Sequence, residues 1–287
     1  MEDRIIRAAL FGFPLGHSVS PAMHHAAAAA LGIGLRYEPW PLPAEELEAA
    51  LSTIRDDAWV GANVTLPHKP AVARLVDRVT PLARRTGAVN TIFKREGILW
   101  GDNTDAPALV RSLRDLTGRS PAEERVLVLG AGGAARAVLV ALEDLGITNV
   151  SLANRTDRKA ASLLREWQAG RSDGAIPARP VSWSRLPDVL GEITLLVNAT
   201  SVGLDGFSTP LADLPLRSGA RVYDLVYGHD ETPLVRHARS LGFEAADGLW
   251  MLVYQAALAF ALWTGLQPPE ENMHAAALAA LRDRVRA

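Results

Sequence analysis

"VLVLGAGGAARAVLVAL", residues 126–142, predicts an apolar β-strand, a glycine turn and an amphipathic helix in direct succession. Gly130, Gly132 and Ala135 fit the pattern G-x-G-x-x-[G/A]. The first glycine permits the tight turn, the second lets the backbone approach a pyrophosphate, and the small third residue packs the helix on the strand. The strand-turn-helix setting favours this interpretation over a glycine turn that serves packing alone. The predicted cofactor-binding residues of the turn are Gly130, Ala131, Gly132, Gly133 and Ala134.

The chain on both sides of this turn alternates short β-rich runs with helical patterns, which is typical of an α/β fold with mostly parallel sheets. One helix is predicted to have Ser20 as its N-cap and Pro21 at its first position, and to end before Gly32. Further strands are predicted at residues 7–13, 35–42, 60–66, 150–154, 193–200 and 220–227. Further helices are predicted at residues 44–55, from about 106, at 249–264 and at 270–284.

The composition changes at residues 118–124, where a polar linker with Gly and Pro precedes the strand of the glycine turn. We therefore expect a first domain at residues 1–105 and a Rossmann-type nucleotide-binding domain at 106–246. The two helices expected in residues 247–287 have no strands of their own to cover, so they could pack back on the first domain.

The bulk properties exclude several classes of protein. The chain has 287 residues, 48% hydrophobic residues, a formal net charge of −2 and no basic stripe, which argues against a nucleic-acid partner. It has no cysteine, so it can form neither a disulfide nor a thiolate metal site, and no Asp/His cluster has metal-ligand spacing. The N-terminus lacks the pattern of a signal peptide. The most apolar run, 249–265, is shorter than the roughly 20 residues of a membrane span. We expect a cytoplasmic protein with no membrane partner.

The end of the strand at residues 150–154 indicates which dinucleotide is bound. NAD-binding proteins usually place Asp or Glu about 20 residues beyond the turn, where the carboxylate accepts the ribose hydroxyls. This chain has no carboxylate there, and a guanidinium such as that of Arg155 can hold a 2′-phosphate with charge-assisted hydrogen bonds. Arg158 and Lys159 taken alone are as well explained as a solvated helix face. The sequence predicts NADP(H), with contacts from Asn154, Arg155, Thr156 and Lys159.

"GANVTLPHKPAV", residues 61–72, holds a lysine between two prolines just after a strand. Pro67 and Pro70 prevent the strand from continuing, which predicts a stiff loop around Lys69. A surface lysine needs only solvent, whereas a lysine that must meet a substrate atom needs a fixed backbone. This stretch therefore indicates a functional role for Lys69.

Nine motifs together resemble the shikimate dehydrogenase family, in the order of that family and over residues 11–268. They are "HSVSPAMH", "GANVTLPHK", "GAVNT", "GDNTD", "VLGAGGAARA", "NRTDRKA", "NATSVGL", "YDLVYGHDETPL" and "DGLWMLVYQAALAF". The resemblance implies NADPH-dependent reduction of 3-dehydroshikimate to shikimate, a step toward the aromatic amino acids. It also implies a substrate domain made from both ends of the chain, with the Rossmann domain inserted between them. A monomer or a homodimer is expected.

The resemblance also implies roles for individual residues. Lys69 resembles the catalytic lysine, and Asp105 its neighbour that orients it; a plain structural ion pair is the alternative. Ser18 and Ser20 would bond the substrate carboxylate, although Ser20 could simply cap its helix. Ring hydroxyls would be bonded by Asn63, Thr65, Asn90, Thr104 and Gln255, with Tyr227 lining the pocket and Gly248 near the cofactor. Any single Asn or Thr among them is also explained by a turn or a strand end.

Three places depart from the family pattern without removing a proposed ligand. Ala106, Pro107 and Ala108 stand where glycines are common, and His229 stands where a proline is common. "HHAAAAALG", residues 24–32, replaces a more usual helix start that contains Asn. A relative that acts on quinate or an amino-shikimate is an alternative, but Thr65 leaves less room than serine for the extra quinate hydroxyl. A non-catalytic NADP-binding regulator is a further alternative, but such a protein would be expected to lack Lys69 or Asp105.

Overall fold

A computed structural model describes residues 5–16, 18–116, 120–169 and 176–286 of the chain. His17 and the first residues of the predicted linker, 118 and 119, lie outside these ranges. The chain forms two compact units: the first combines Met1–Ala108 with Leu252–Ala287, and the second is Leu109–Met251. Two helices carry the chain between the units: α5 (Asp105–Leu116) and α10 (Leu249–Thr264).

The first unit contains a six-stranded sheet in the order β2-β1-β3-β5-β6-β4. Its strands are β1 (Ile6–Gly12), β2 (Leu35–Pro41), β3 (Trp59–Val64), β4 (Arg78–Val79), β5 (Thr91–Arg95) and β6 (Ile98–Asp102). β1 is parallel to β2 and β3, whereas β5 is antiparallel to β3 and β6. The β5–β6 hairpin turns at Glu96 and Gly97, whose φ angles are 53° and 76°, as a two-residue hairpin turn requires. The sequence analysis did not predict this antiparallel hairpin.

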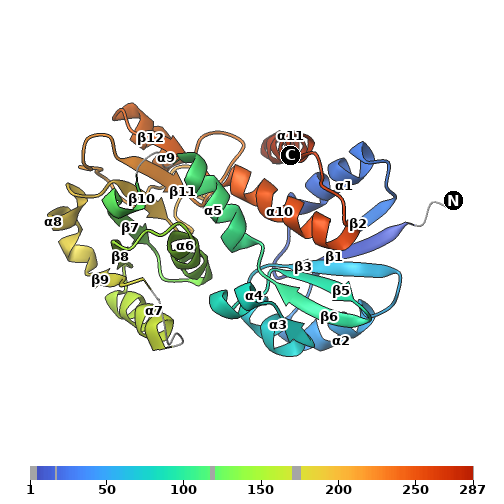
Figure 1. The fold of residues 1–287 in the computed structure, drawn as a ribbon. Coiled ribbons are helices and arrows are strands. Elements are labelled where there is room, and N and C mark those ends of the chain that lie inside the picture. Colours follow the sequence, from blue (N-terminus) through green and yellow to red (C-terminus); the bar gives the residue numbers. More distant parts are fainter. Residues whose placement is uncertain (1–4, 17, 117–119, 170–175, 287) are drawn as a thin grey trace. The chain divides into compact units, whose positions relative to one another are not determined.

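Helices cover both faces of this sheet (Figure 1). Ala9 and Phe11 pack in one apolar cluster with residues of the helices on one side, whereas Ala8 and Leu10 pack on the other side with Trp263. The helices of the first cluster are α2 (Leu47–Thr53), α3 (Lys69–Leu75) and α4 (Pro81–Thr86), with the 3₁₀ turn η1 (Ala44–Glu46) before α2. On the other side, α10 supplies Trp263, and α1 (Ser20–Ala30) packs against α11 (Glu270–Arg286).

The second unit contains six parallel strands in the order β12-β11-β10-β7-β8-β9. They are β7 (Val126–Leu129), β8 (Val150–Ala153), β9 (Arg179–Val181), β10 (Leu195–Asn198), β11 (Arg221–Asp224) and β12 (Glu244–Ala246). This is the doubly wound dinucleotide-binding order, in which the strand sequence reverses between β7 and β10. The α/β class predicted from the sequence is confirmed.

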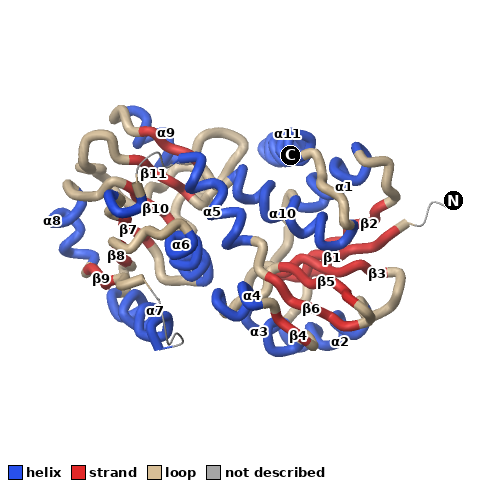
Figure 2. The backbone as a smooth tube through the Cα atoms, viewed as in Figure 1, coloured by secondary structure: helices blue, strands red, loops and turns tan. Residues whose placement is uncertain are grey.

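Helices of the second unit connect and cover these strands (Figure 2). They are α6 (Gly133–Asp144), α7 (Asp157–Ala169), α8 (Leu186–Leu190) and α9 (Pro233–Ser240), with the 3₁₀ turns η2 (Pro121–Glu123) and η3 (Trp183–Arg185). Leu127 and Leu129 pack with residues of α8 and α9, and Val126 and Val128 are buried on the opposite face. A strand buried on both faces reads as a continuous apolar run, which explains the sequence "VLVL".

Two local predictions are wrong. Ser20 is the first residue of α1 and not its cap; the cap position is Val19, and Ser18 Oγ accepts the backbone N–H of Ser20 at 3.2 Å. Lys69 does not lie in a loop but is the first residue of α3. Proline suits the first turn of a helix because its missing N–H would have no partner there, so Pro70 is accommodated at the second position of this helix.

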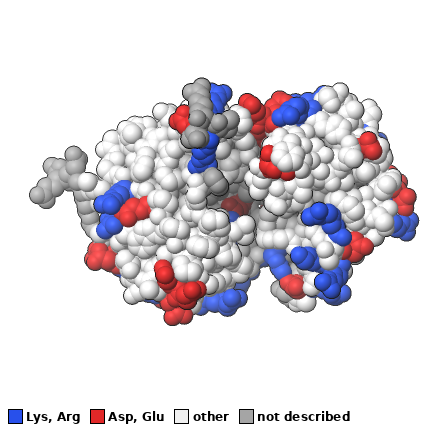
Figure 3. Space-filling view, turned by 180° about the vertical axis from the view of Figure 1, so that it is seen from behind, with Lys and Arg blue, Asp and Glu red and all other residues white. Residues whose placement is uncertain are grey.

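The distribution of surface charge is relevant to nucleic-acid binding, and the length of the apolar helices is relevant to membrane insertion. On the face seen in Figure 3, Lys and Arg side chains are interspersed with Asp and Glu side chains and do not form a continuous stripe. Within the described ranges, no helix combines the length and the apolar character that crossing a membrane would require.

Candidate active site

Lys69 and Asp105 form an ion pair in the first unit. Lys69 Nζ lies 2.7 Å from Asp105 Oδ2, and the two side chains are 26% and 15% exposed. Each residue is the first of its helix, and Asn103 Oδ1 accepts the N–H of Ala106 at 3.0 Å, which caps the helix of Asp105. Because both side chains keep some exposure, a ligand can reach the ammonium group from solvent.

Asn90, which is itself held by Thr104, donates to the other oxygen of this carboxylate. Asn90 Nδ2 lies 2.8 Å from Asp105 Oδ1 and 2.9 Å from Thr104 Oγ1. The backbone N–H of Thr104 donates to Asn90 Oδ1 at 2.7 Å, so the amide of Asn90 is held at both ends. The structure therefore brings together four predicted site residues, and both carboxylate oxygens of Asp105 accept a hydrogen bond.

Asn63 and Thr65 extend this group of polar side chains along β3. Asn63 lies opposite Thr91 in the antiparallel pairing of β3 and β5, and Asn63 Nδ2 is 3.3 Å from Thr91 Oγ1. Thr65 follows the strand, is half-buried, and its backbone N–H donates to the carbonyl of Phe11 at 2.8 Å. Asn63 is buried, with 6% exposure, so its polar atoms need partners inside the protein.

Ser18, Ser20 and Gln255 also lie in the first unit. The carbonyl of Ser18 accepts a hydrogen bond from Arg284 Nη2 at 2.7 Å, which ties this loop to α11. Burial raises the pKa of the Tyr37 phenol, and a side-chain hydrogen bond with Ser20 opposes that rise. Gln255 is half-buried, and its Nε2 donates to the carbonyl of Leu252 in its own helix at 2.7 Å. The apolar helix thus satisfies one donor of the Gln255 amide by itself.

A pocket of about 690 Å³ lies in the second unit at the carboxyl ends of β7, β8 and β10. It is lined by Gly130, Ala131, Gly132, Asn154, Arg155, Trp183, Ala199, Thr200, Ser201, Val202, Asp205, Ser208, Thr209 and Pro210. A crevice at the point where the strand order reverses is the place where this fold binds ligands. The pocket therefore matches the predicted cofactor site in position.

The glycine turn has the geometry that a pyrophosphate needs. Gly130 has φ +111°, and a Cβ there would lie 2.8 Å from the carbonyl oxygen of Ala199. Gly132 and Gly133 differ, because a Cβ at either position would have no atom within 4 Å. Gly130 is thus required by the close approach of two strands, whereas Gly132 and Gly133 leave open space at the N-terminus of α6, where helix N–H groups favour phosphate.

Of the residues predicted to bind the ribose phosphate, Asn154 and Arg155 line the pocket and Thr156 and Lys159 do not. Arg155 is exposed, and Asn154 Nδ2 donates to the carbonyl of Thr156 at 3.0 Å. Gly133 and Ala134 are likewise not lining residues. Trp183 and the polar residues after β10 were not predicted. The motif "NATSVGL" could have indicated the latter, because it follows a strand next to the glycine turn.

Gly248 and Tyr227 also belong to the second unit. The N–H of Gly248 donates to the carbonyl of Val226 at 3.0 Å, and a Cβ on Gly248 would lie 2.3 Å from the carbonyl oxygen of Leu225. Packing alone therefore requires a glycine at this position, and a cofactor contact stays a prediction. Tyr227 is half-buried, and its contact with the substrate also stays a prediction.

Asp224, at the end of β11, is a buried carboxyl group that the sequence analysis did not single out. Its oxygens accept hydrogen bonds from Asn198 Nδ2 at 2.8 Å, the Thr232 hydroxyl at 2.7 Å and the N–H of Val226 at 3.1 Å. Burial raises the pKa of Asp224 to about 6, and the hydrogen bonds from Thr232, Val226 and Asn198 oppose the rise. This carboxyl group anchors the loop after β11 that leads to Tyr227.

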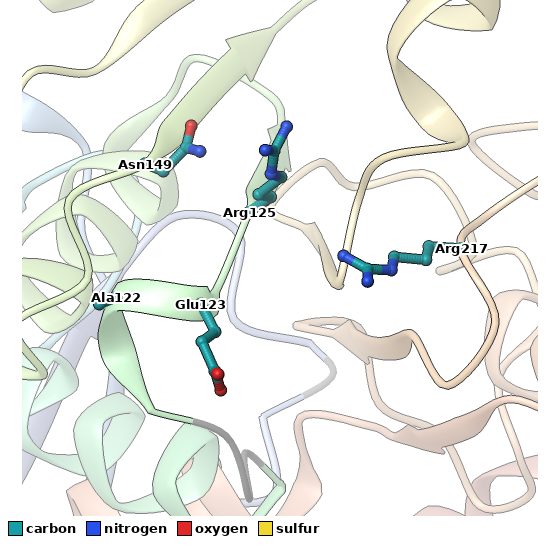
Figure 4. Close-up of a pocket in the computed structure, with 5 residues that line it drawn as sticks. All are labelled: Ala122, Glu123, Arg125, Asn149 and Arg217. Carbon is teal, nitrogen blue, oxygen red and sulfur yellow. The ribbon is translucent and has the colours of Figure 1, made fainter.

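A second pocket, of about 300 Å³, is unrelated to the predicted site (Figure 4). It is lined by Ala122, Glu123, Arg125, Asn149 and Arg217. Arg125 precedes β7 and Asn149 precedes β8, so this pocket lies at the amino ends of the strands, opposite to the glycine turn. In the described part of the chain, no three His, Asp or Glu side chains are grouped as metal ligands.

Three sequence models of one enzyme family match this chain. Residues 10–92 match the shikimate dehydrogenase substrate binding domain, residues 113–202 match shikimate / quinate 5-dehydrogenase, and residues 248–278 match the shikimate 5′-dehydrogenase C-terminal domain. The shikimate dehydrogenase (NADP(+)) of Citrifermentans bemidjiense is 43% identical over 278 residues, which cover 96% of this chain and 95% of that protein.

Solved structures give the same result. The shikimate 5-dehydrogenase of Thermus thermophilus in complex with NADP(H) and shikimate has a TM-score of 0.84 and 41% identity, covering 96% of this chain and 100% of the other. The quinate dehydrogenase of Corynebacterium glutamicum in complex with NAD has a TM-score of 0.87 and 31% identity, covering 96% and 99%. The resemblance predicted from nine motifs is confirmed, and the chain belongs to the shikimate dehydrogenase family.

Proposed function

We propose that this protein catalyses the reversible NADPH-dependent reduction of 3-dehydroshikimate to shikimate, a step toward the aromatic amino acids. The single observation that carries this proposal is the pair of Lys69 Nζ and Asp105 Oδ2 at 2.7 Å, with Asn90 donating to the other carboxylate oxygen at 2.8 Å. Membership in the family supports the substrate and the cofactor, and the retained pair supports turnover over a purely regulatory role.

Lys69 is the acid–base group that donates and accepts the proton of the reaction. In the direction of reduction its ammonium group donates a proton to the substrate oxygen and stabilises the charge that develops there; in the reverse direction the neutral amine removes that proton. Asp105 orients the ammonium group and is itself held by Asn90. NADPH, when bound, supplies the hydride.

The second unit would hold the cofactor. The open space at Gly132 and Gly133 and the N-terminus of α6 suit a pyrophosphate, and exposed Arg155 on the pocket wall suits a 2′-phosphate. Asn154 lines the same wall, and Thr156, Lys159 and Gly248 would assist from nearby. We assign NADP binding to residues 106–246.

The first unit would hold the substrate, which carries one carboxylate and several hydroxyls. Ser18 and Ser20 lie at the N-terminus of the 11-residue helix α1, where backbone N–H groups and the helix dipole favour an anion. Hydroxyls would be bonded by Asn63, Thr65, Asn90, Thr104 and Gln255, and Tyr227 would line the substrate pocket. We assign substrate binding to residues 1–105, with residues 247–287 completing that domain.

One assay tests this proposal and its alternatives. Purified protein is incubated with shikimate or quinate and with NADP⁺ or NAD⁺, and the absorbance of reduced nicotinamide is followed. We expect shikimate with NADP⁺ to give the highest kcat/KM. A preference for quinate would indicate the quinate relative, and turnover with an amino-shikimate alone would indicate that alternative. No turnover with any pair, together with measurable NADP⁺ binding, would indicate a regulator.

Two finer expectations complete the proposal. The absence of cysteine fits a reducing compartment, so we place the protein in the cytoplasm, which cell fractionation tests. We also expect a monomer or a homodimer in solution, which light scattering coupled to size-exclusion chromatography decides.

A further inference from the structure

The side-chain oxygen of Asn63 receives two hydrogen-bond donors from the protein interior. Tyr37 Oη lies 2.9 Å and His24 Nε2 lies 3.1 Å from Asn63 Oδ1. The three side chains come from β2, α1 and β3 and are at most 6% exposed. The His24 ring stacks on that of Tyr37 with a centroid distance of 4.4 Å, so ring packing keeps both donors in place.

These contacts determine which way the Asn63 amide points. Its Nδ2 faces two acceptors, the carbonyl of Asn90 at 3.4 Å and Thr91 Oγ1 at 3.3 Å. The flipped amide would bring Oδ1 against the Asn90 carbonyl, which cannot donate, whereas the hydroxyls of Tyr37 and Thr91 can donate or accept in either orientation. The Asn90 carbonyl therefore selects the orientation with Nδ2 toward it, and in that orientation Tyr37 and His24 donate to Oδ1.

His24 can donate to Asn63 only if its proton is on Nε2. Its Nδ1 is buried and has no hydrogen-bond partner among the described residues, whereas its Nε2 faces the amide oxygen. Burial lowers the pKa of His24 to about 3, with the hydrogen bond to Asn63 opposing and the charge of His25 adding to the effect, so the ring is neutral. A neutral imidazole carries one proton, and the partner at Nε2 selects its position.

From Asn63 the hydrogen bonds run in one direction to the catalytic pair. Asn63 Nδ2 donates to Thr91 Oγ1, the Thr91 hydroxyl donates to Asn90 Oδ1 at 3.2 Å, and Asn90 Nδ2 donates to Asp105 Oδ1 at 2.8 Å. The other oxygen of Asp105 accepts from Lys69. The order of donors and acceptors thus begins at His24 and Tyr37 and ends at the carboxylate that orients Lys69.

We infer that His24 and Tyr37 are positioning residues, which hold the Asn63 amide in the orientation that directs this chain of hydrogen bonds toward Asp105 and Lys69. Neither residue is assigned a contact with the substrate or the cofactor; both act through Asn63, and Tyr37 also forms a side-chain hydrogen bond with Ser20. The kinetic part of the inference rests on the proposed function, because it assumes that Lys69 and Asp105 carry the reaction.

The first test is a double-mutant cycle on kcat/KM for shikimate with saturating NADP⁺. Tyr37→Phe removes one donor and keeps the ring. We expect it to lower kcat/KM about 3- to 10-fold, which corresponds to the net contribution of one hydrogen bond. The combined change Tyr37→Phe with His24→Phe should cost about 30-fold or more. In an Asn63→Ala background, Tyr37→Phe should cost clearly less kcat/KM than in the parent protein, because only the hydrogen bond of Tyr37 with Ser20 then connects it to the site. The KM for NADP⁺ should stay within twofold throughout.

Phe93→Leu is the matched control. Phe93 lies in the same apolar cluster as Tyr37 but has no polar atom, so it reports on packing alone. We expect Phe93→Leu to lower the melting temperature at least as much as Tyr37→Phe and to leave kcat/KM within twofold. An equal loss for Tyr37→Phe in both backgrounds, or a loss for Phe93→Leu as large as that of the combined change, would overturn the inference.

The second test does not depend on activity. Long-range ¹⁵N–¹H NMR spectra of ¹⁵N-histidine-labelled protein, with His24→Phe used to assign the signal, report the His24 tautomer at pH 7. We expect a neutral ring protonated on Nε2; a proton on Nδ1 or a charged ring would overturn the assigned direction. If the unmodified protein turns over no substrate, the proposed function has failed, and this spectrum still decides whether Asn63 is held as inferred.

Discussion

Lys69 Nζ and Asp105 Oδ2 lie 2.7 Å apart although 36 positions of sequence separate the two residues. Each residue begins a helix, and α3 and α5 start from different strands of the same sheet. Two helix starts are rigid positions, so the distance between ammonium and carboxylate is set by the sheet and not by flexible loops. An acid–base group needs this kind of fixed position.

Replacing Lys69 by alanine should lower kcat by at least about 100-fold and leave the affinity for NADPH within twofold. The positioned proton donor is lost, which is typically worth 10²–10⁴ in rate, whereas the pocket beside the glycine turn, which we propose holds NADPH, lies in the other unit. Steady-state kinetics and fluorescence titration with NADPH measure the two quantities. Lys94→Ala is the matched control, since Lys94 bonds backbone carbonyls of the same unit. A near-normal kcat for Lys69→Ala would remove this lysine from the chemistry.

Replacing Arg155 by alanine should raise the KM for NADPH about 10-fold or more and change the KM for NADH less than twofold. The guanidinium on the pocket wall can bond a 2′-phosphate that only NADPH carries. Arg165→Ala, an exposed arginine further along α7, is the control and should change neither value. Equal losses for NADPH and NADH would contradict the phosphate contact.

Replacing Asp224 by asparagine should reduce the loss of stability of the second unit as the pH rises from 4 to 7.5. In the folded protein burial raises the pKa of Asp224 to about 6 from an ordinary value of 3.8. The folded state then holds the proton more tightly than the unfolded state, so the stabilising contribution is present below pH 3.8 and is lost as the pH rises through 6. A shift of this size corresponds to about 3 kcal/mol at most.

Urea unfolding of parent and Asp224→Asn at several pH values tests this, because other titrating groups cancel in the difference between the two proteins. We expect that difference to move in favour of the variant between pH 4 and pH 7.5. A difference that stays constant across this range would show that Asp224 does not titrate there.

Replacing Gly248 by alanine should destabilise the second unit by about 1–3 kcal/mol, without any cofactor present. The added Cβ would lie 2.3 Å from the carbonyl oxygen of Leu225, so the backbone must move. Gly191→Ala is the control, since its nearest neighbour would be the carbonyl oxygen of Pro215 at 3.9 Å. Thermal unfolding of the apoprotein measures both. An unchanged melting temperature for Gly248→Ala would show that packing does not require this glycine, and a cofactor contact would then be the better explanation for it.

The sequence predicted the elements whose pattern is local. The strand, turn and helix at residues 126–142 follow from an apolar run, the glycine spacing and a period of 3.6, and α10 has the predicted bounds Leu249–Thr264. A local pattern also failed, at the start of α1. Serine is a common N-cap residue, which is why Ser20 was predicted as the cap. The N-cap position falls on Val19 instead, and Ser18 supplies the acceptor for the N–H of Ser20.

The sequence by itself determined the α/β class, the nucleotide turn, the cation at the strand end and, through nine motifs, the family. Only the tertiary structure decided that Asn90 bonds Asp105, that Trp183 and the loop after β10 line the pocket beside the glycine turn, and that His24 and Tyr37 donate to Asn63. The physical reason is that hydrogen bonds and pockets form between groups that are distant along the chain. Residue spacing records the period of a helix or strand but carries no information about which strands become neighbours.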